Sequence, residues 1–320
     1  MNRKSFLFFT VLSGMMLITA KFAPVIAQSS ADIWDMPPKT MSLDIPSSVE
    51  FCGKKISLER YDMRERFDRE QLTFMYMHST SLQLIKRANR FFPIIEPILK
   101  ANGIPDDFKY LAVVESALDV RALSPVKAAG IWQFMDDTGK RYGLEINSEV
   151  DERYHVEKST VAACKFLKEA YDKYGDWATV AASYNAGMQK ISAEQDKQSV
   201  SSSFDMLLVP ETSRYVFRIL AAKRFLENPK KFGFYLKKEH LYQDIRTDEV
   251  KVTGPVADWS DWAKQYGLTY SELKDFNVWL RDRGLTNKTG KTYIISIPKK
   301  EDLNFDVRKI KVYNKNWVVD

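Results

Sequence analysis

Residues 110–135 read YLAVVESALDVRALSPVKAAGIWQFM, and the rest of the fold is arranged around this stretch. From residue 110 to residue 118 the chain is apolar or small except at Glu115 and Ser116, which predicts a helix with little solvent-exposed face. Phe108, Leu111 and Leu118 stand at helical spacing from Glu115, so its carboxyl group is expected on an apolar stripe. Burial without a cation raises the pKa of a glutamate, and a carboxyl that stays protonated near neutral pH can act as a general acid. The alternative is a structural glutamate held by an arginine or by backbone donors.

The composition is that of a globular protein with one main core and a smaller module. The chain has 320 residues, which suits this size class. Its formal charge of +6 favours an anionic partner, and nucleic acid, an anionic membrane surface and a carboxylate-bearing cell wall all fit.

The N-terminus indicates export. Arg3 and Lys4 precede an apolar run over residues 6–20, and small residues up to Ala27 offer a cleavage site. We therefore expect a cleaved signal peptide over residues 1–27 and a periplasmic or cell-envelope location; an uncleaved membrane anchor is the alternative. Residues 28–56 carry prolines and no sustained apolar period, which predicts an extended linker.

The cysteines and histidines point to no metal or cofactor. Cys52 and Cys164 could pair in an oxidising compartment, or Cys164 could be a small buried apolar residue. The three histidines lack the spacing of zinc ligands. No cofactor is expected.

The chain from residue 57 to residue 236 predicts an all-α region. Residues 57–103 form an N-terminal helical segment in which Pro93 must bend or divide the second helix. Further helices are expected at 131–142, 159–174, 177–184 and 211–227, and residues 189–203 are expected to be a polar surface loop. The helix that delivers Glu115 starts near Pro105.

The composition changes near residue 237. Two short strands, 250–252 and 293–297, enclose two short helices, 259–266 and 271–277, which predicts a small β-α-α-β module over residues 250–298. A basic tail follows over residues 299–320.

Several motifs, in a fixed order along the chain, are similar to those of a known protein family. They are Glu115-Ser116, Ser124, Gly130-Ile131-Trp132-Gln133-Phe134, the run from Ala182 to Gly187, and Glu211-Thr212 with Tyr215-Val216. With these motifs the chain resembles the soluble-lytic-transglycosylase family over roughly residues 104–226. The resemblance implies a goose-lysozyme-like helical catalytic domain over residues 104–236. It also implies cleavage of the β-1,4 bond between N-acetylmuramic acid and N-acetylglucosamine in peptidoglycan.

The resemblance also assigns roles to residues. Glu115 would be the single catalytic residue, acting first as acid and then as base, with a 1,6-anhydro sugar as product. Substrate-binding positions would be Ser124, Gln133, Tyr184, Asn185 and Tyr215, with the Tyr215 hydroxyl orienting the acid. From the residues alone, Ser124 would be a helix cap and Gln133 a surface amide. Asn185 would be a helix C-cap and Tyr215 a core aromatic residue. Asp119, the nearest other carboxylate in the sequence, suits a structural contact.

The partner implied is the peptidoglycan glycan strand, not nucleic acid, with peripheral association with the envelope. The module over residues 250–298 is similar to a LysM domain, except that Gly254-Pro255-Val256 replaces the usual opening. Glycan binding and a purely structural role are both open for it. Asp136 and Ser183 also depart from the family pattern. Two other functions remain: a hydrolytic muramidase of the same fold, and a non-catalytic cell-wall-binding protein.

Overall fold

The structure is a computed structural model and describes residues 41–319. The signal peptide expected over residues 1–27 lies outside the described residues, as does the first part of the expected linker. In residues 41–319 no helix is both long and apolar enough to cross a membrane.

Helices dominate the first two thirds of the described chain, as predicted. The α-helices are α2 (Tyr61–Tyr76), α3 (His78–Ala101), α4 (Lys109–Ser116), α5 (Asp136–Arg141), α6 (Val156–Tyr174), α7 (Trp177–Ala186), α8 (Met188–Gln198) and α9 (Pro210–Glu227). Short 3-10 helices are η1 (Asp106–Phe108), η2 (Glu152–Tyr154), η3 (Pro229–Phe232) and η4 (Lys238–His240).

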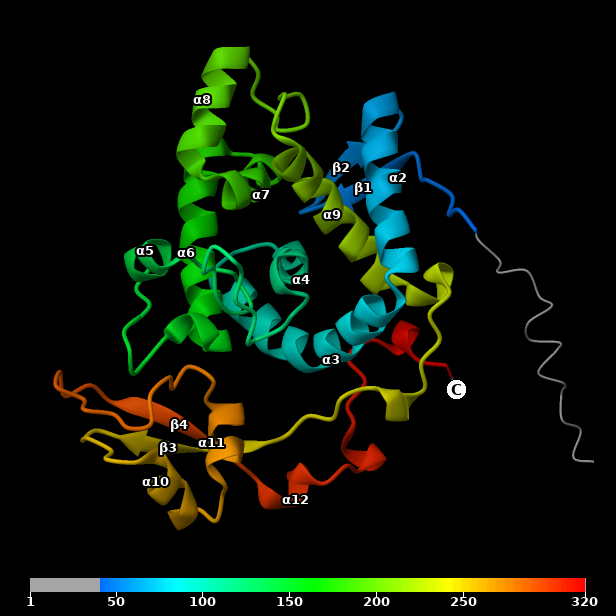
Figure 1. Ribbon diagram of the computed structural model, residues 1–320. Coiled ribbons are helices and arrows are strands. Elements are labelled where there is room, and N and C mark those ends of the chain that lie inside the picture. The colour runs from blue at the N-terminus through cyan, green and yellow to red at the C-terminus, as the bar shows by residue number, and fades with distance from the viewer. Residues whose placement is uncertain (1–40, 320) are drawn as a thin grey trace, which may run out of the picture. The chain divides into compact units, whose positions relative to one another are not determined.

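Helix α4 is the buried element of this helical region. Its residues from Lys109 to Val113 are buried, and α3 and α9 pack directly against it. Figure 1 shows α4 enclosed by other helices, with the curved α3 running beneath it. The apolar sequence around Glu115 therefore lies in the body of the fold, as expected.

Helix α3 is bent and not divided. It continues from residue 78 to residue 101 with Pro93 and Pro97 inside it, and Figure 1 shows its curvature. Phe92, Ile95 and Leu99 are fully buried along its inner face. This packing outweighs the hydrogen bonds that the prolines remove.

The C-terminal module has the predicted β-α-α-β order. It consists of β3 (Thr247–Val252), α10 (Trp259–Gln265), α11 (Tyr270–Phe276) and β4 (Tyr293–Pro298). The two strands are antiparallel, with Thr247 opposite Pro298 and Val252 opposite Tyr293. From residue 43 onward the helical region and this module form one compact unit.

Part of the expected linker is a β-hairpin. Strands β1 (Ser48–Phe51) and β2 (Lys54–Ser57) pair antiparallel, and β1 contacts α9. Phe51 and Ile56 are buried in the main core, and Phe51 packs against Phe108 at 5.7 Å between ring centroids. The sequence of this segment has too few apolar residues to predict a hairpin. The hairpin is stabilised by packing against residues from distant parts of the chain.

Two other expectations about loops were wrong. Residues 189–203 were expected to be a surface loop, but most of them belong to α8, whose Ile191 is fully buried. Its Gln, Glu, Lys and Ala residues are good helix formers, so a polar composition did not mean a loop. The helix expected from residue 131 begins only at Asp136. Residues 131–134 instead complete a turn, with a bridge between Ala129 and Phe134.

The residues expected to form a basic tail fold back onto the core. They include α12 (Lys300–Leu303), η5 (Val307–Lys309) and η6 (Lys315–Trp317). Trp317 is buried, and its indole nitrogen donates to the Leu226 carbonyl at 2.5 Å. The Tyr313 hydroxyl donates to Glu96 of α3. The aromatic residues Trp317 and Tyr313 therefore hold the basic C-terminal segment against the core.

Candidate active site

Glu115 is the last residue but one of α4, and the chain turns sharply after it. Ala117 and Leu118 both have left-handed backbone conformations, with φ of 53° and 56°. Such conformations are costly for non-glycine residues. They are held in place by the fully buried Leu118 side chain and by Arg87 of α3, which donates to the Ala117 carbonyl at 3.0 Å and to Asp119 at 3.2 Å. Asp119 thus makes a structural contact at the helix end.

Glu115 is half-buried, and burial has the largest influence on the pKa of its carboxyl group. Burial raises its pKa from 4.5 to about 7. The Tyr215 hydroxyl of α9 donates to Glu115 Oε1, and this hydrogen bond lowers the pKa, as does the charge of Arg218. The charge of Glu211 raises it. Burial therefore prevails over the tyrosine and the arginine, and the group titrates near neutral pH.

Tyr184 and Asn185 lie at the end of α7, next to the start of α9. The Tyr184 hydroxyl donates to the Trp132 carbonyl at 2.8 Å, and burial together with the Glu115 charge holds the pKa of Tyr184 well above its usual value. Asn185 Oδ1 accepts a hydrogen bond from the Thr212 hydroxyl at 2.8 Å. Both predicted residues thus tie α7 to neighbouring elements of the site.

Ser124 and Gln133 lie on the loop over residues 122–134. The Ser124 hydroxyl accepts from the Ala128 amide at 3.0 Å, and the Gln133 side-chain amide donates to the carbonyls of Gly130 at 2.9 Å and Ala122 at 3.3 Å. Among the described residues no hydrogen bond joins either side chain to Glu115. They shape the loop, which is fastened to α4 where the Ser116 hydroxyl donates to the Ile131 carbonyl at 2.9 Å.

Position 130 requires glycine because the backbone of Arg153 passes very close to it. Its φ is +76°, and a Cβ atom there would stand 1.8 Å from the Arg153 carbonyl oxygen. A side chain at this position is therefore excluded both by conformation and by space.

Arg153 organises the same loop and was missed from the sequence. Its guanidinium is buried and makes a two-point ion pair with Asp151, with distances of 2.9 and 2.6 Å. It also donates to the Lys127 carbonyl at 2.9 Å and to the Phe134 carbonyl at 3.2 Å. No local pattern marks its role in the loop, because the two carbonyls that it holds belong to residues 26 and 19 positions away along the chain.

The described residues offer no cluster of three or more metal-ligating side chains. Cys52 and Cys164 are free thiols in the structure, and burial raises the pKa of both, that of Cys164 to about 12. Neither cysteine contributes a reactive thiolate near neutral pH.

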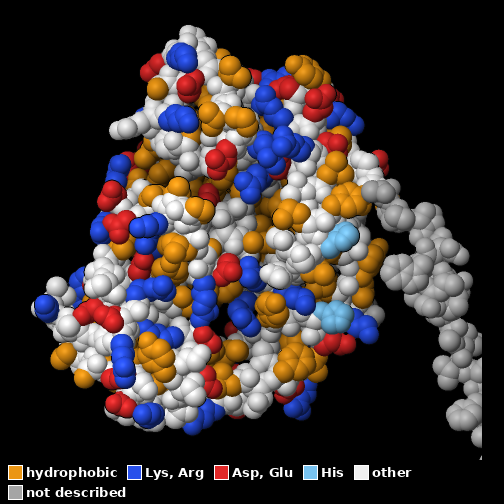
Figure 2. All heavy atoms as spheres, viewed as in Figure 1, with side chains coloured by type: hydrophobic (Ala, Val, Ile, Leu, Met, Phe, Trp, Pro, Cys, Tyr) orange, Lys and Arg blue, Asp and Glu red, His pale blue; other side chains and the backbone are white. Residues whose placement is uncertain are grey.

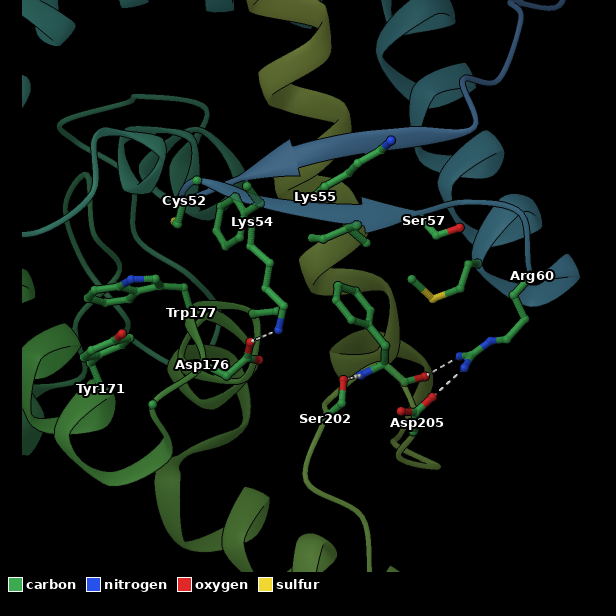
Figure 3. A pocket seen from close by; sticks show the side chains of 17 residues that line it. Cys52, Lys54, Lys55, Ser57, Arg60, Tyr171, Asp176, Trp177, Ser202 and Asp205 are labelled. Carbon is green, nitrogen blue, oxygen red and sulfur yellow. Dashed lines mark hydrogen bonds and ion pairs between the residues drawn. The ribbon is translucent and has the colours of Figure 1, made fainter.

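A separate pocket of about 580 Å³ lies beneath the β1–β2 hairpin (Figure 3). Trp177 stacks on Tyr171 at 3.9 Å between centroids, and Lys54 pairs with Asp176 at 3.0 Å. None of the predicted site residues lines this pocket. Figure 2 shows acidic and basic side chains interspersed with apolar ones over the face of the molecule that is also drawn in Figure 1.

Two family models match the helical region and the C-terminal module of this chain. Residues 92–205 match the transglycosylase SLT domain family, and residues 248–301 match the soluble lytic transglycosylase C-terminal LysM-like domain. These two matches confirm the resemblance that the sequence motifs indicated.

The chain is also similar to individual proteins. The chain is 30% identical over 258 residues to membrane-bound lytic murein transglycosylase D of Escherichia coli K12, and equally to that of Escherichia coli O6:H1. The match covers 78% of this chain and 55% of each relative, so the chain spans about half the length of these curated relatives. Among solved structures, the 70 kDa soluble lytic transglycosylase of Escherichia coli matches with a TM-score of 0.37 and 21% identity, covering 42% of this chain and 24% of that chain.

Proposed function

We propose that this chain is a peptidoglycan lytic transglycosylase that acts in the cell envelope. It cleaves the β-1,4 bond between N-acetylmuramic acid and N-acetylglucosamine and forms a 1,6-anhydro end. The observation that carries the proposal concerns Glu115, which is half-buried and lies within the part of the chain that matches the SLT domain family. Burial raises the pKa of its carboxyl group to about 7. Such a group can hold a proton at neutral pH and give it up during the reaction.

The proposed mechanism uses Glu115 twice. Protonated Glu115 donates its proton to the glycosidic oxygen as the bond from the muramic C1 to that oxygen breaks. The acetamido oxygen of the same muramic residue forms a bond to C1 and stabilises the developing positive charge. The Glu115 carboxylate then removes the proton from the muramic O6, and O6 attacks C1 and displaces the acetamido oxygen. The carboxyl regains its proton, so no net proton and no water is consumed.

Tyr215 has a defined part in this scheme. Its hydroxyl donates to Glu115 and moderates the rise in pKa that burial causes. Without it, the carboxyl would be a weaker acid and a less well oriented one. Ser124 and Gln133 hold the shape of the loop against which the sugar would bind.

The two-carboxylate form of the hydrolytic alternative needs a second carboxylate that activates water or forms a covalent intermediate. Asp119 is held by Arg87 at the helix end. Glu211 is exposed and lies near enough for its charge to act on Glu115. Glu211→Gln therefore tests this alternative, since a hydrolase that used Glu211 would lose turnover.

The deciding experiment is product analysis on purified sacculi. Mass spectrometry should find 1,6-anhydro-muramic ends; a product heavier by one water would establish hydrolysis instead. Glu115→Gln should abolish release of fragments and leave sedimentation of the protein with sacculi unchanged. Fragment release by Glu115→Gln at the wild-type rate would overturn the assignment of Glu115.

A further inference from the structure

The LysM-like module docks on the helical region through backbone hydrogen bonds. The Asp151 amide donates to the Trp279 carbonyl at 2.9 Å, and the Arg281 amide donates to the Glu149 carbonyl at 2.8 Å. Between these bonds Val150 forms a bridge with Leu280. The chain between α11 and β4 is therefore joined to residues 149–151 as a short piece of sheet.

Side chains extend this contact. The Glu149 carboxylate accepts from the Thr286 amide and hydroxyl at 3.0 and 3.1 Å. Glu145 pairs with Lys291 at 2.9 Å and accepts from the Tyr293 hydroxyl at 3.0 Å. The module is thus held at several separate points along residues 145–151, in a defined orientation.

The apolar core of the module also includes residues of the helical region. Ala129, Val150 and Tyr154 belong to the same buried cluster as the module's own core residues. His155 stacks on Trp279 with 5.6 Å between centroids. Ala129 is fully buried there and belongs to the 122–134 loop that carries Ser124 and Gln133.

The docked segment in turn holds the 122–134 loop. Asp151, whose amide is bonded to the module, is also the ion-pair partner of Arg153. Arg153 donates to the carbonyls of Lys127 and Phe134, and its own carbonyl lies against Gly130. A buried bidentate arginine holds its partners in one geometry, and loss of one partner leaves a buried charge unpaired.

We propose that the LysM-like module is a positioning element of the active site, acting through Asp151 and Arg153 on the 122–134 loop. Its catalytic consequence rests on the proposed function. Its structural consequence is independent of the proposed function, because the 122–134 loop should lose order whenever the module separates from residues 149–151.

This role differs from that of a tether. A tether raises the local concentration of an enzyme on an insoluble polymer and has no effect on short soluble substrates. A positioning element affects every substrate that the loop contacts, including a soluble glycan oligomer too short to reach the module.

The principal test is hydrogen exchange measured by mass spectrometry on the full chain. Val150→Asp places a charge in the shared core and should release the module. Peptides covering residues 122–134 should then exchange at least about tenfold faster, because their loop amides lose a fixed frame. Unchanged exchange in this loop, alongside faster exchange in residues 145–151, would overturn the proposal.

A second pair of variants guards against misfolding. Glu149→Ala with Lys291→Ala removes two polar docking contacts without a change in net charge or any cut into the core. The matched control is Asp248→Ala with Lys299→Ala, an ion pair at 2.6 Å inside the module. The docking variant should speed exchange in the 122–134 loop about threefold or more, and the control should leave it as in the wild type.

Kinetics on soluble, uncrosslinked glycan oligomers supply the functional readout. The docking variant should raise KM about threefold or more with a smaller change in kcat, since the loop binds sugar and does not carry the acid. Loss of activity on sacculi alone would support a tether and refute positioning. If the wild type turns over no glycan, the proposed function fails, while the exchange experiment still decides the role of the module.

Discussion

Glu115→Gln should make the protein more stable at alkaline pH, and the size of the effect follows from the site. The pKa of Glu115 is raised from 4.5 to about 7 in the folded chain, mainly by burial. Below pH 4.5 the group is protonated in both the folded and the unfolded state. Between pH 4.5 and about 7 the unfolded chain releases its proton and the folded chain keeps it, so stability falls. Above about pH 7 this loss is complete.

Glutamine has nearly the same shape and cannot ionise, so the variant avoids this loss. The rise of the pKa corresponds to about 3 kcal/mol of unfolding free energy. Because the carboxyl keeps some contact with solvent, about 2 kcal/mol is the smallest gain that we expect at pH 8. The hydrogen bond from Tyr215 can be retained by the glutamine oxygen.

The assay is urea unfolding of both proteins at several values between pH 4 and pH 8.5. The difference in unfolding free energy should be near zero at pH 4 and should grow to about 2–3 kcal/mol by pH 8. Glu249→Gln, at an exposed position of β3, controls for the loss of one negative charge. A difference that does not change with pH would refute the idea that Glu115 titrates near neutrality.

Three other outcomes are expected. Tyr215→Phe removes a hydrogen bond that lowers the pKa of Glu115, so the alkaline limb of the kcat/KM profile should move up by about 1–2 pH units; an unmoved limb would contradict this role. Gly130→Ala should destabilise the fold by about 4 kcal/mol or more in chemical unfolding, whereas Gly175→Ala, with a similar φ of +61° but open space, should cost about 1–2 kcal/mol. Trp317→Ala should cost about 3–5 kcal/mol, because the side chain is buried; a loss below about 1 kcal/mol would mean that the C-terminal segment is not anchored.

Local sequence patterns were sufficient for the regular elements. The apolar period predicted helices at 159–174 and 211–227, and the structure places them at Val156–Tyr174 and Pro210–Glu227. The strands and short helices of the C-terminal module were predicted in the right order. These elements depend on neighbours within one or two turns, or within one strand, so the sequence carries their signal directly.

Features built from distant contacts were not predictable in this way. The hairpin over residues 48–57 has too short an apolar pattern to stand alone and is stable only against the helical core. Trp317 similarly anchors a basic segment through a carbonyl 91 residues earlier. A polar stretch became α8 because its few apolar residues meet the core on one side.

The same distinction between local sequence and distant contacts applies to the candidate site. The sequence by itself determined that Glu115 sits on an apolar helix, because burial of that helix follows from the absence of a polar face. Only the tertiary structure decided that the Tyr215 hydroxyl reaches this carboxyl across 100 residues. It also decided that Arg153 bonds the loop over residues 122–134 and that its partner Asp151 bonds the C-terminal module. Hydrogen bonds and ion pairs act over a few ångströms in space, and the chain brings their partners together only when it folds.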